Sequence, residues 1–286
     1  MKPSSFAYHA PKTVEAAVAL LARVAPDDGR VIAGGQSLVP IMNFRLASPG
    51  HLIDINGIDA LATARQQDGA LVIPACVRHA AFETPIIPGV LGRLLSEIAG
   101  NIAHHPIRVR GTFCGSLAHA DPSSEWCLAA ATLGAVVTLK SVRGERRLPI
   151  NEFLMGTMST ALAPDELLLE VSLPLLPEGA HFGFSEISRR AGDFAMAAAL
   201  AVWRLDGGKI VDVRIGVGGA ESRARRIPEA ESTLQGMPPG KAAFAKAADT
   251  AADALIDVLE DARSTAEYRR DLVRAVIRRA LERGQT

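Results

Sequence analysis

The sequence contains Ala33-Gly34-Gly35-Gln36-Ser37-Leu38 directly after a short apolar run, and later Gly111-Thr112-Phe113-Cys114-Gly115-Ser116. Because glycine has no Cβ, the backbone N–H groups of such loops can approach a diphosphate closely. Neither loop matches the P-loop, and the cluster Gly216-Val217-Gly218-Gly219-Ala220-Glu221 lacks the third glycine of the Rossmann fingerprint. We therefore predict a dinucleotide site of another class; the alternative for the first loop is a simple tight turn.

Composition limits the class of protein. The 286 residues are 48% apolar, which is enough for one large domain or two ordinary ones. The 31 basic and 31 acidic residues balance, so no net charge attracts nucleic acid or an anionic membrane. No apolar run reaches the ~18 residues of a membrane span. The first residues also lack the apolar stretch of a secretory signal, so we expect a cytoplasmic protein.

The cysteines and histidines do not form metal-binding motifs. Cys76, Cys114 and Cys127 are far apart, whereas an iron–sulfur cluster usually needs four thiolates, so redox chemistry here would need an organic cofactor. We interpret His104, His105 and His119 as polar loop residues and expect no metal site. A hydrolase triad of Ser116, His119 and Asp121 is disfavoured because no nucleophile elbow is present.

The first part of the chain alternates strands and helices. A helix is expected over 14–23 with Thr13 as its N-cap, and another over 123–133 with Asp121 or Ser123 as its cap. Ser123 to Glu125 would thus bring a helix N-terminus near the second glycine loop. A further helix is expected over 89–102, and strands over 30–33, 52–55, 70–75, 135–140 and 167–173.

The character of the sequence changes after Pro174, Pro177 and Gly179. Beyond them we predict a three-stranded antiparallel sheet over 182–189, 196–205 and 209–217, with a hairpin at Asp206-Gly207-Gly208. The alanine-rich run 194–201 has helical propensity but is assigned to the second strand because the hairpin follows it. Two helices are expected over 241–261 and 265–283, the latter with a Ser264–Glu267 capping box and its arginines on a solvated face.

Three motifs together are similar to one family. They are Ala33-Gly34-Gly35-Gln36-Ser37-Leu38 with Pro40, Gly111-Thr112 with Gly115 to Pro122, and Ser188-Arg189-Arg190 with Asp193-Phe194. The chain thereby resembles the FAD-binding medium subunit of the molybdenum hydroxylases, which include the xanthine, carbon monoxide and N-heteroaromatic dehydrogenases. The resemblance implies an α+β fold: a two-lobed FAD domain of the vanillyl-alcohol-oxidase type over 1–177, with lobes of about 1–56 and 57–177, and a small α+β domain over 178–286.

The resemblance also implies roles for particular residues. The first loop would hold the FAD diphosphate, and the second loop would complete the cradle. Ile102 and Ala103, at the end of the helix over 89–102 and just after it, would line the cofactor. Ser124 and Glu125 would contact the ribityl or adenosine part, Leu168 the ring environment, and Phe194 would lie beside the flavin. Cys114 stands where glycine is usual, and Glu125 where aspartate is more frequent. The predicted cofactor-binding residues are Ile32, Ala33, Gly34, Gly35, Gln36, Ser37, Leu38, Ile102, Ala103, Gly111, Thr112, Gly115, Ser116, His119, Ser124, Glu125, Leu168 and Phe194.

The function implied by the resemblance is electron transfer. Substrate would be hydroxylated at a molybdopterin cofactor on a large partner subunit. Electrons would then pass through [2Fe-2S] clusters on a small partner subunit to FAD on this chain, and from there to an external acceptor. A dimer of heterotrimers is expected, and no residue of this chain needs to be an acid–base catalyst. The alternatives are a stand-alone FAD-dependent oxidase and a flavin-free assembly subunit that docks through the arginine-rich last helix.

Overall fold

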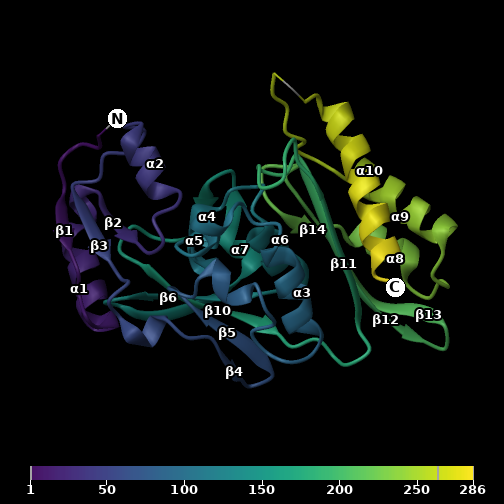
Figure 1. The fold of residues 1–286 in the computed structure, drawn as a ribbon, viewed down its shortest axis with the longest axis horizontal. Coiled ribbons are helices and arrows are strands. Elements are labelled where there is room, and N and C mark those ends of the chain that lie inside the picture. Colours follow the sequence, from purple (N-terminus) through teal and green to yellow (C-terminus); the bar gives the residue numbers. More distant parts are fainter. Residues whose placement is uncertain (1, 263, 286) are drawn as a thin grey trace.

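The computed structural model describes residues 2–262 and 264–285. Within these residues the strands form sheets of three, five and four strands and one two-stranded hairpin. Figure 1 shows the sheets following one another along the molecule, with the first at one end and the last, with its helices, at the other. This arrangement confirms the two-lobed domain followed by a smaller α+β domain.

The first lobe is a parallel sheet of order β1-β3-β2. Helix α1 packs on it through Ala17, Val18 and Leu21, and the Thr13 hydroxyl accepts a hydrogen bond from the Ala16 N–H (3.1 Å), so the predicted N-cap is confirmed. The elements are β1 (Ala7–His9), α1 (Val14–Val24), β2 (Gly29–Ile32), α2 (Leu38–Asn43) and β3 (His51–Asp54).

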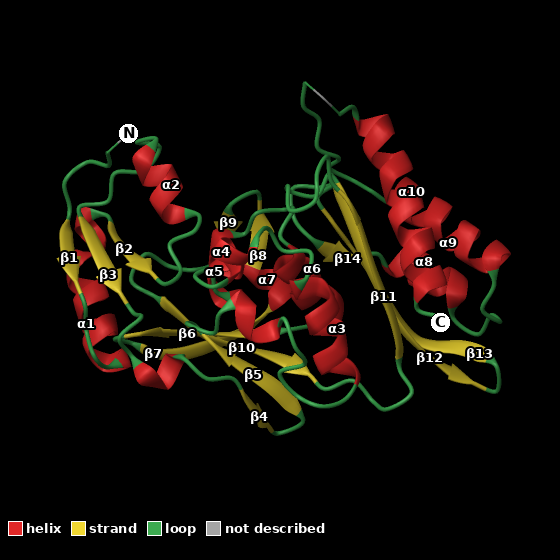
Figure 2. Ribbon diagram, viewed as in Figure 1, coloured by secondary structure: helices red, strands yellow, loops and turns green. Residues whose placement is uncertain are grey.

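The second lobe is an antiparallel sheet of order β4-β5-β10-β6-β7, and Figure 2 shows its helices gathered on one side of it. The buried rings of Phe82, Phe113 and Trp126 pack together between the sheet and these helices. The strands are β4 (Arg65–Gln67), β5 (Ala70–Pro74), β6 (Val136–Ser141), β7 (Gly144–Pro149) and β10 (Leu167–Pro174). The other elements are α3 (Val90–Ala99), α4 (His105–Arg108), α5 (Phe113–His119), α6 (Glu125–Leu133), α7 (Ile150–Phe153) and the hairpin of β8 (Leu154–Gly156) and β9 (Ser159–Thr160).

The last sheet has the order β11-β12-β13-β14 and is buried on both faces. Along β12, Ala198 and Leu200 belong to the core shared with the first domain, whereas Ala199 and Trp203 belong to the core under α8–α10. Figure 1 shows these helices on the outer side of the sheet. The elements are β11 (His181–Ile187), β12 (Ala197–Asp206), β13 (Lys209–Gly218), β14 (Arg225–Arg226), α8 (Pro228–Leu234), α9 (Lys241–Asp253) and α10 (Ala266–Arg283).

Several local predictions for this part of the chain were wrong. The alanine-rich run is a strand as expected, but β14 adds a fourth strand, α8 was missed, and the helix expected over 241–261 ends at Asp253. The N-cap of α10 is Thr265, whose hydroxyl accepts from the Tyr268 N–H (3.2 Å), while the Ser264 hydroxyl is buried without a partner among the described residues.

The arginines of α10 are not all on a solvated face. Arg269 is 7% exposed and donates to the carbonyl oxygens of Met196 (3.0 Å) and Gly219 (2.6 Å). Arg270 and Arg283 also donate to backbone carbonyls of neighbouring segments. Part of the helix's positive charge therefore fastens α10 to the sheet. In the described part of the chain, no helix is both long and apolar enough to cross a bilayer.

Candidate functional site

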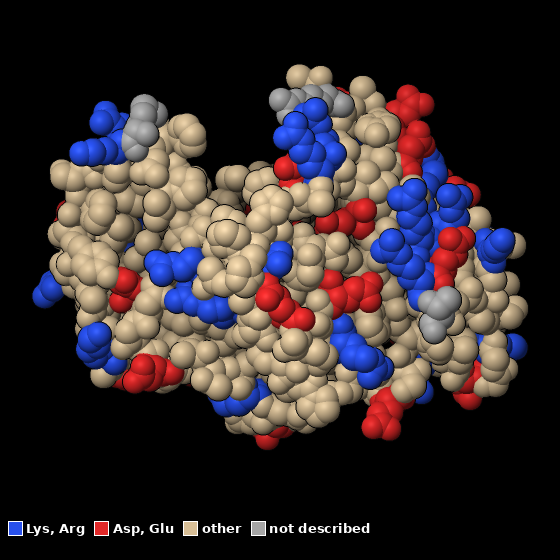
Figure 3. All heavy atoms as spheres, in the orientation of Figure 1, with Lys and Arg blue, Asp and Glu red and all other residues tan. Residues whose placement is uncertain are grey.

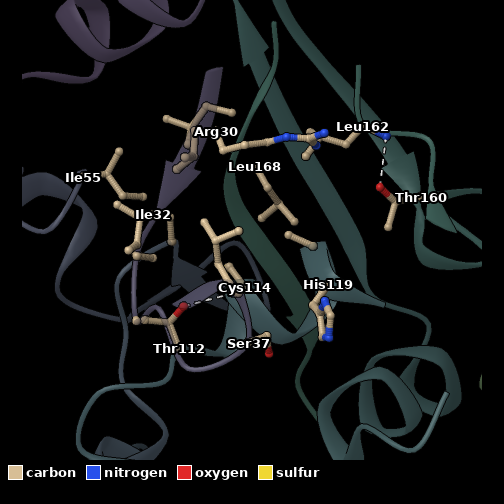
Figure 4. A pocket seen from close by; sticks show the side chains of 18 of the residues that line it. Arg30, Ile32, Ser37, Ile55, Thr112, Cys114, His119, Thr160, Leu162 and Leu168 are labelled. Carbon is tan, nitrogen blue, oxygen red and sulfur yellow. Dashed lines mark hydrogen bonds between the residues drawn. The ribbon is translucent and has the colours of Figure 1, made fainter. Parts of the chain in front are cut away.

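A cavity of about 720 Å³ lies between the two lobes, within the size range of small-molecule sites. Figure 3 shows the surface hollowed between the part that carries α2 and the part that carries the start of α10. In Figure 4, Ser37, Thr112 and His119 lie around one end of the cavity and Arg30, Thr160 and Leu162 around the other. The predicted residues that line it are Ile32, Ala33, Gly34, Gly35, Gln36, Ser37, Leu38, Gly111, Thr112, Gly115, Ser116, His119 and Leu168.

The first glycine loop connects β2 to α2 and presents unpaired backbone donors to the cavity. Gly35 has a φ of 71°, a conformation that favours glycine. The N–H groups of residues 34–37 have no acceptor within the described chain. These residues are half-buried along the cavity wall, and backbone donors left open at such a place suit an anionic ligand.

The two glycine loops touch each other. A Cβ on Gly34 would lie 2.3 Å from the Arg110 carbonyl oxygen and 2.7 Å from the Gly111 Cα. On the other side, a Cβ on Gly111 would lie 2.4 Å from the His79 Nε2. Glycine is therefore required at Gly34 because the two backbones approach too closely for a side chain, and at Gly111 because the buried His79 ring occupies the space.

The second glycine loop runs directly into a helix. Thr112 is the N-cap of α5, and its hydroxyl accepts from the Gly115 N–H (3.0 Å), so Gly115 and Ser116 are helical. Cys114 is buried in this helix and its Sγ donates to the Ile73 carbonyl (3.3 Å). Cys114 is helical and has no positive φ, so its backbone conformation does not require glycine.

The opposite wall of the cavity was not predicted. It comes from the segment between β9 and β10, including Leu162 and Ala163. The buried Glu166 carboxylate fixes this segment, because it pairs with Arg146 (2.7 Å) and accepts from the Ala163 N–H (2.9 Å). No local sequence motif marks these residues. Further lining residues that the sequence did not predict include Arg30, Ile55, His79, Met158, Thr160 and Pro164.

The structure places the remaining predicted residues outside the cavity. They are Ile102, Ala103, Ser124, Glu125 and Phe194, of which Phe194 lies in the turn over 188–195. A Cβ on Gly192 of this turn would lie 3.1 Å from the Ala103 carbonyl oxygen, so the turn rests on that segment. Helix α5, which lines the cavity, leads directly into the segment that holds Ser124 and Glu125.

The loop before α6 also contacts this turn, and its cap differs from the one expected. Ser123 donates its hydroxyl to the Ala195 carbonyl (2.8 Å). Asp121 accepts from the Ser123 N–H (2.8 Å) instead of capping the helix, and Ser124 is the N-cap, accepting from the Cys127 N–H (3.4 Å). Phe194 is 74% exposed on the turn, where its ring is free to meet a ligand or a partner.

Two carboxyl groups in this region are unusual. Burial raises the pKa of Glu125 to about 7 and that of Glu186, on β11, to about 8. The charge of Glu125 raises the pKa of Glu186 further, so the two groups are electrostatically coupled. The Glu186 Oε2 is buried and has no hydrogen-bond partner among the described residues. At neutral pH the pair therefore retains a proton.

His79 lines the cavity as a neutral imidazole. It is 5% exposed, and burial lowers its pKa to about 4, with the charges of Arg78 and Arg108 acting in the same direction. The Trp126 indole N–H donates to Nδ1 (2.9 Å), so the remaining proton is on Nε2, beside Gly111. This tautomer offers a neutral donor, rather than a charge, under the second loop.

The depressed pKa of His79 predicts acid sensitivity. The unfolded chain takes up a proton below about pH 6.5, while the folded chain resists until about pH 4, so stability is lost as the pH falls through this window. Between pH 7 and pH 4.5 we expect the free energy of unfolding to fall by about 2 kcal/mol more in the wild type than in His79→Gln. Denaturant unfolding at both pH values measures the difference, with His105→Gln as the exposed control; equal losses in wild type and His79→Gln would contradict the assignment.

Comparisons with known proteins agree with this geometry. Residues 4–176 match the model of the FAD binding domain in molybdopterin dehydrogenase, and residues 182–283 match the carbon monoxide dehydrogenase flavoprotein C-terminal domain. The chain is 41% identical over 285 residues to the 6-hydroxypseudooxynicotine dehydrogenase complex subunit alpha of Paenarthrobacter nicotinovorans, covering 99% of this chain and 96% of the relative. It is 35% identical to the carbon monoxide dehydrogenase medium chain of Afipia carboxidovorans, covering 100% and 98%.

Solved structures give the same result over the full length. Quinoline 2-oxidoreductase from Pseudomonas putida 86 superposes with a TM-score of 0.93 at 34% identity, covering 100% of this chain and 99% of that one. A carbon monoxide dehydrogenase from Hydrogenophaga pseudoflava superposes with a TM-score of 0.94 at 36% identity, covering 100% and 99%.

Proposed function

This chain belongs to the family of FAD-binding medium subunits of molybdenum hydroxylases, and from that premise we propose that it transfers electrons within a larger complex. Electrons would arrive from [2Fe-2S] clusters on a small partner subunit and leave to an external acceptor. The molybdopterin cofactor on a large partner subunit would hydroxylate the substrate, so this chain itself would not select it. We further propose a dimer of heterotrimers.

The observation that carries the proposal is the close contact of the two glycine loops beside a cavity with open backbone donors. The N–H groups of residues 34–37 would hold the diphosphate of FAD, with Thr112 to Ser116 completing the cradle. Leu168 and Ile32 supply apolar walls, and Arg30 and Thr160 supply polar groups at the far end. The residues present thus fit a dinucleotide.

We also propose that the flavin ring lies near the turn over 188–195. Gly192 of this turn rests against the Ala103 carbonyl, Ser123, which precedes Ser124, donates to the Ala195 carbonyl, and Phe194 belongs to the turn itself. Bound FAD accepts electrons one or two at a time and so can join one-electron carriers to a two-electron acceptor. The contribution of the chain would be to hold the ring, exclude water from one side of it and set its potential.

The cysteines support the proposal that the iron–sulfur clusters are bound by a partner subunit. Cys76, Cys114 and Cys127 are buried, and burial raises the pKa of each thiol. Buried thiols that stay protonated are poor ligands for a cluster, which requires thiolates and usually four of them. The clusters would therefore belong to another chain.

Purification of the chain with its partners tests this function. We expect a yellow complex that absorbs near 450 nm, contains about one FAD per chain and contains molybdenum and iron only when the partner subunits are present. A colourless chain that cannot be reconstituted with FAD would favour the assembly subunit. Oxidation of alcohols by the isolated yellow chain would favour the stand-alone oxidase.

A further inference from the structure

A polar chain of side chains joins the two glycine loops underneath the cavity. The Asn56 Nδ2 donates to the Ala33 carbonyl in the first loop (2.7 Å). The Arg78 guanidinium donates both to the Asn56 Oδ1 and to the Arg110 carbonyl, which directly precedes Gly111. Asn56 and Arg78 thus bridge a carbonyl of one loop to a carbonyl of the other.

Neighbouring groups fix both members of this bridge. Asp54 Oδ1 accepts from the Asn56 Nδ2 (2.6 Å) and from the Asn56 N–H (2.9 Å), and Asp54 Oδ2 accepts from the Tyr8 hydroxyl. These bonds orient the Asn56 amide so that its oxygen faces Arg78. The bridge is therefore oriented from the first sheet, on which Tyr8 and Asp54 lie.

The backbone around Arg78 is paired with the second loop. The His79 N–H donates to the Gly111 carbonyl (3.0 Å), and the Phe113 N–H donates to the Val77 carbonyl (3.1 Å). Arg78 and Thr112 form the antiparallel bridge between these two bonds. Any displacement of Arg78 is consequently transmitted to the second loop.

From this geometry we propose that Asn56 and Arg78 act as one clamp that sets the spacing of the glycine loops, and that affinity for a diphosphate depends on the clamp as a unit. The two are positioning residues, because they act through the backbone of the loops. Gly34 touches the Arg110 carbonyl region directly, so a small change in loop spacing alters where the N–H groups of residues 34–37 point. The inference rests on the proposed FAD site.

A double-mutant cycle tests the clamp. The probes are FAD, ADP and riboflavin, titrated into the cofactor-stripped full chain with any partner subunits that co-purify. We expect Arg78→Met and Asn56→Leu each to lower the affinity for FAD and for ADP about 10-fold. The affinity of the double variant should be within about twofold of that of either single variant, because the effects of residues that act as a unit are non-additive. Riboflavin, which has no diphosphate, should bind all variants alike.

Further variants distinguish a loss of affinity caused by the broken clamp from a loss caused by the missing charge or by misfolding. Arg78→Lys keeps the charge but replaces the planar two-ended donor, so we expect it to bind ADP as weakly as Arg78→Met. Arg65→Met, which removes an exposed ion pair with Glu170 (2.8 Å), is the matched control and should bind normally. Thermal unfolding of every variant identifies losses of affinity that come from misfolding. If Asn56→Leu unfolds early, Asn56→Asp replaces it in the cycle, and if Arg78→Met does, Arg78→Gln replaces it.

The outcomes distinguish this inference from the proposed function. A wild-type chain that binds neither FAD nor ADP would overturn the proposed function, and the clamp with it. If the wild type binds both FAD and ADP, three results would overturn the clamp alone. They are additive losses of affinity in the cycle, normal ADP affinity in Arg78→Lys, and a loss of riboflavin affinity as large as the loss of FAD affinity.

Discussion

Gly34→Val should abolish FAD retention while the C-terminal domain remains folded. The new Cβ would lie 2.3 Å from the Arg110 carbonyl oxygen and 2.7 Å from the Gly111 Cα, so the glycine loops must separate. Both contacts are to backbone, which cannot move aside as the end of a flexible side chain can. We expect the affinity for FAD to fall at least 100-fold, equivalent to about 2.7 kcal/mol. FAD content after purification and titration of the stripped chain measure the loss.

The matched control for this variant is Gly240→Ala. A Cβ on Gly240 would meet no atom of the described chain within 4 Å, and the residue lies before α9, far along the chain from both loops. Its extended φ of 170° suits any residue, so FAD content should be unchanged. Normal flavin content in Gly34→Val would refute the assignment of the first loop to the diphosphate.

Glu186→Gln should stabilise the protein increasingly as the pH rises. The folded chain keeps a proton on Glu186 up to about pH 8, whereas the unfolded chain releases it near its ordinary pKa of 4.5. Wild-type stability is therefore lost as the pH rises through this window. The full shift corresponds to about 5 kcal/mol, and because solvent screens part of this side chain we expect about 3 kcal/mol at pH 8.5.

The measurement is denaturant unfolding of the stripped chain at pH 5 and pH 8.5. At pH 5 the wild type and Glu186→Gln should differ little, since the carboxyl is protonated and resembles the amide. Titrating groups that are not coupled to Glu186, His79 included, are present in both proteins and cancel in the difference, whereas the contribution of the coupled Glu125 is part of the measured effect. Glu178→Gln, at an exposed position, should show no such trend. A gap that is the same at both pH values would contradict the buried, proton-retaining carboxyl.

Elements with local signals could be predicted from the sequence. Thr13 was recognisable as a cap because its hydroxyl serves an N–H three residues away, and the hairpin at Asp206-Gly207-Gly208 follows from turn chemistry. By contrast, β14 has two residues and depends on contacts outside the strand: Arg226 pairs with Glu231 (2.6 Å), which also accepts from the Ile215 N–H on β13 (2.9 Å). Such tertiary stabilisation leaves no periodic pattern to detect.

The same distinction applies to the candidate site. The glycine loops were recognisable because glycine marks close backbone approach wherever it is required. Asn56, Arg78 and His79 were missed because each is an ordinary polar residue in its own segment. Their importance arises only when the fold brings Ala33 and Gly111 together, and that contact cannot be read from spacing in one sequence.

The sheet that is buried on both faces has a mechanical consequence. Its inner side meets α6 so closely that a Cβ on Gly216 would lie 1.9 Å from the Thr132 Oγ1, and Arg214 donates to the Leu133 carbonyl (2.8 Å). An interface packed to this density does not slide or hinge without losing its contacts. The second lobe and the C-terminal domain should consequently move as a single rigid unit, whereas the turn that bears Phe194 keeps this side chain exposed.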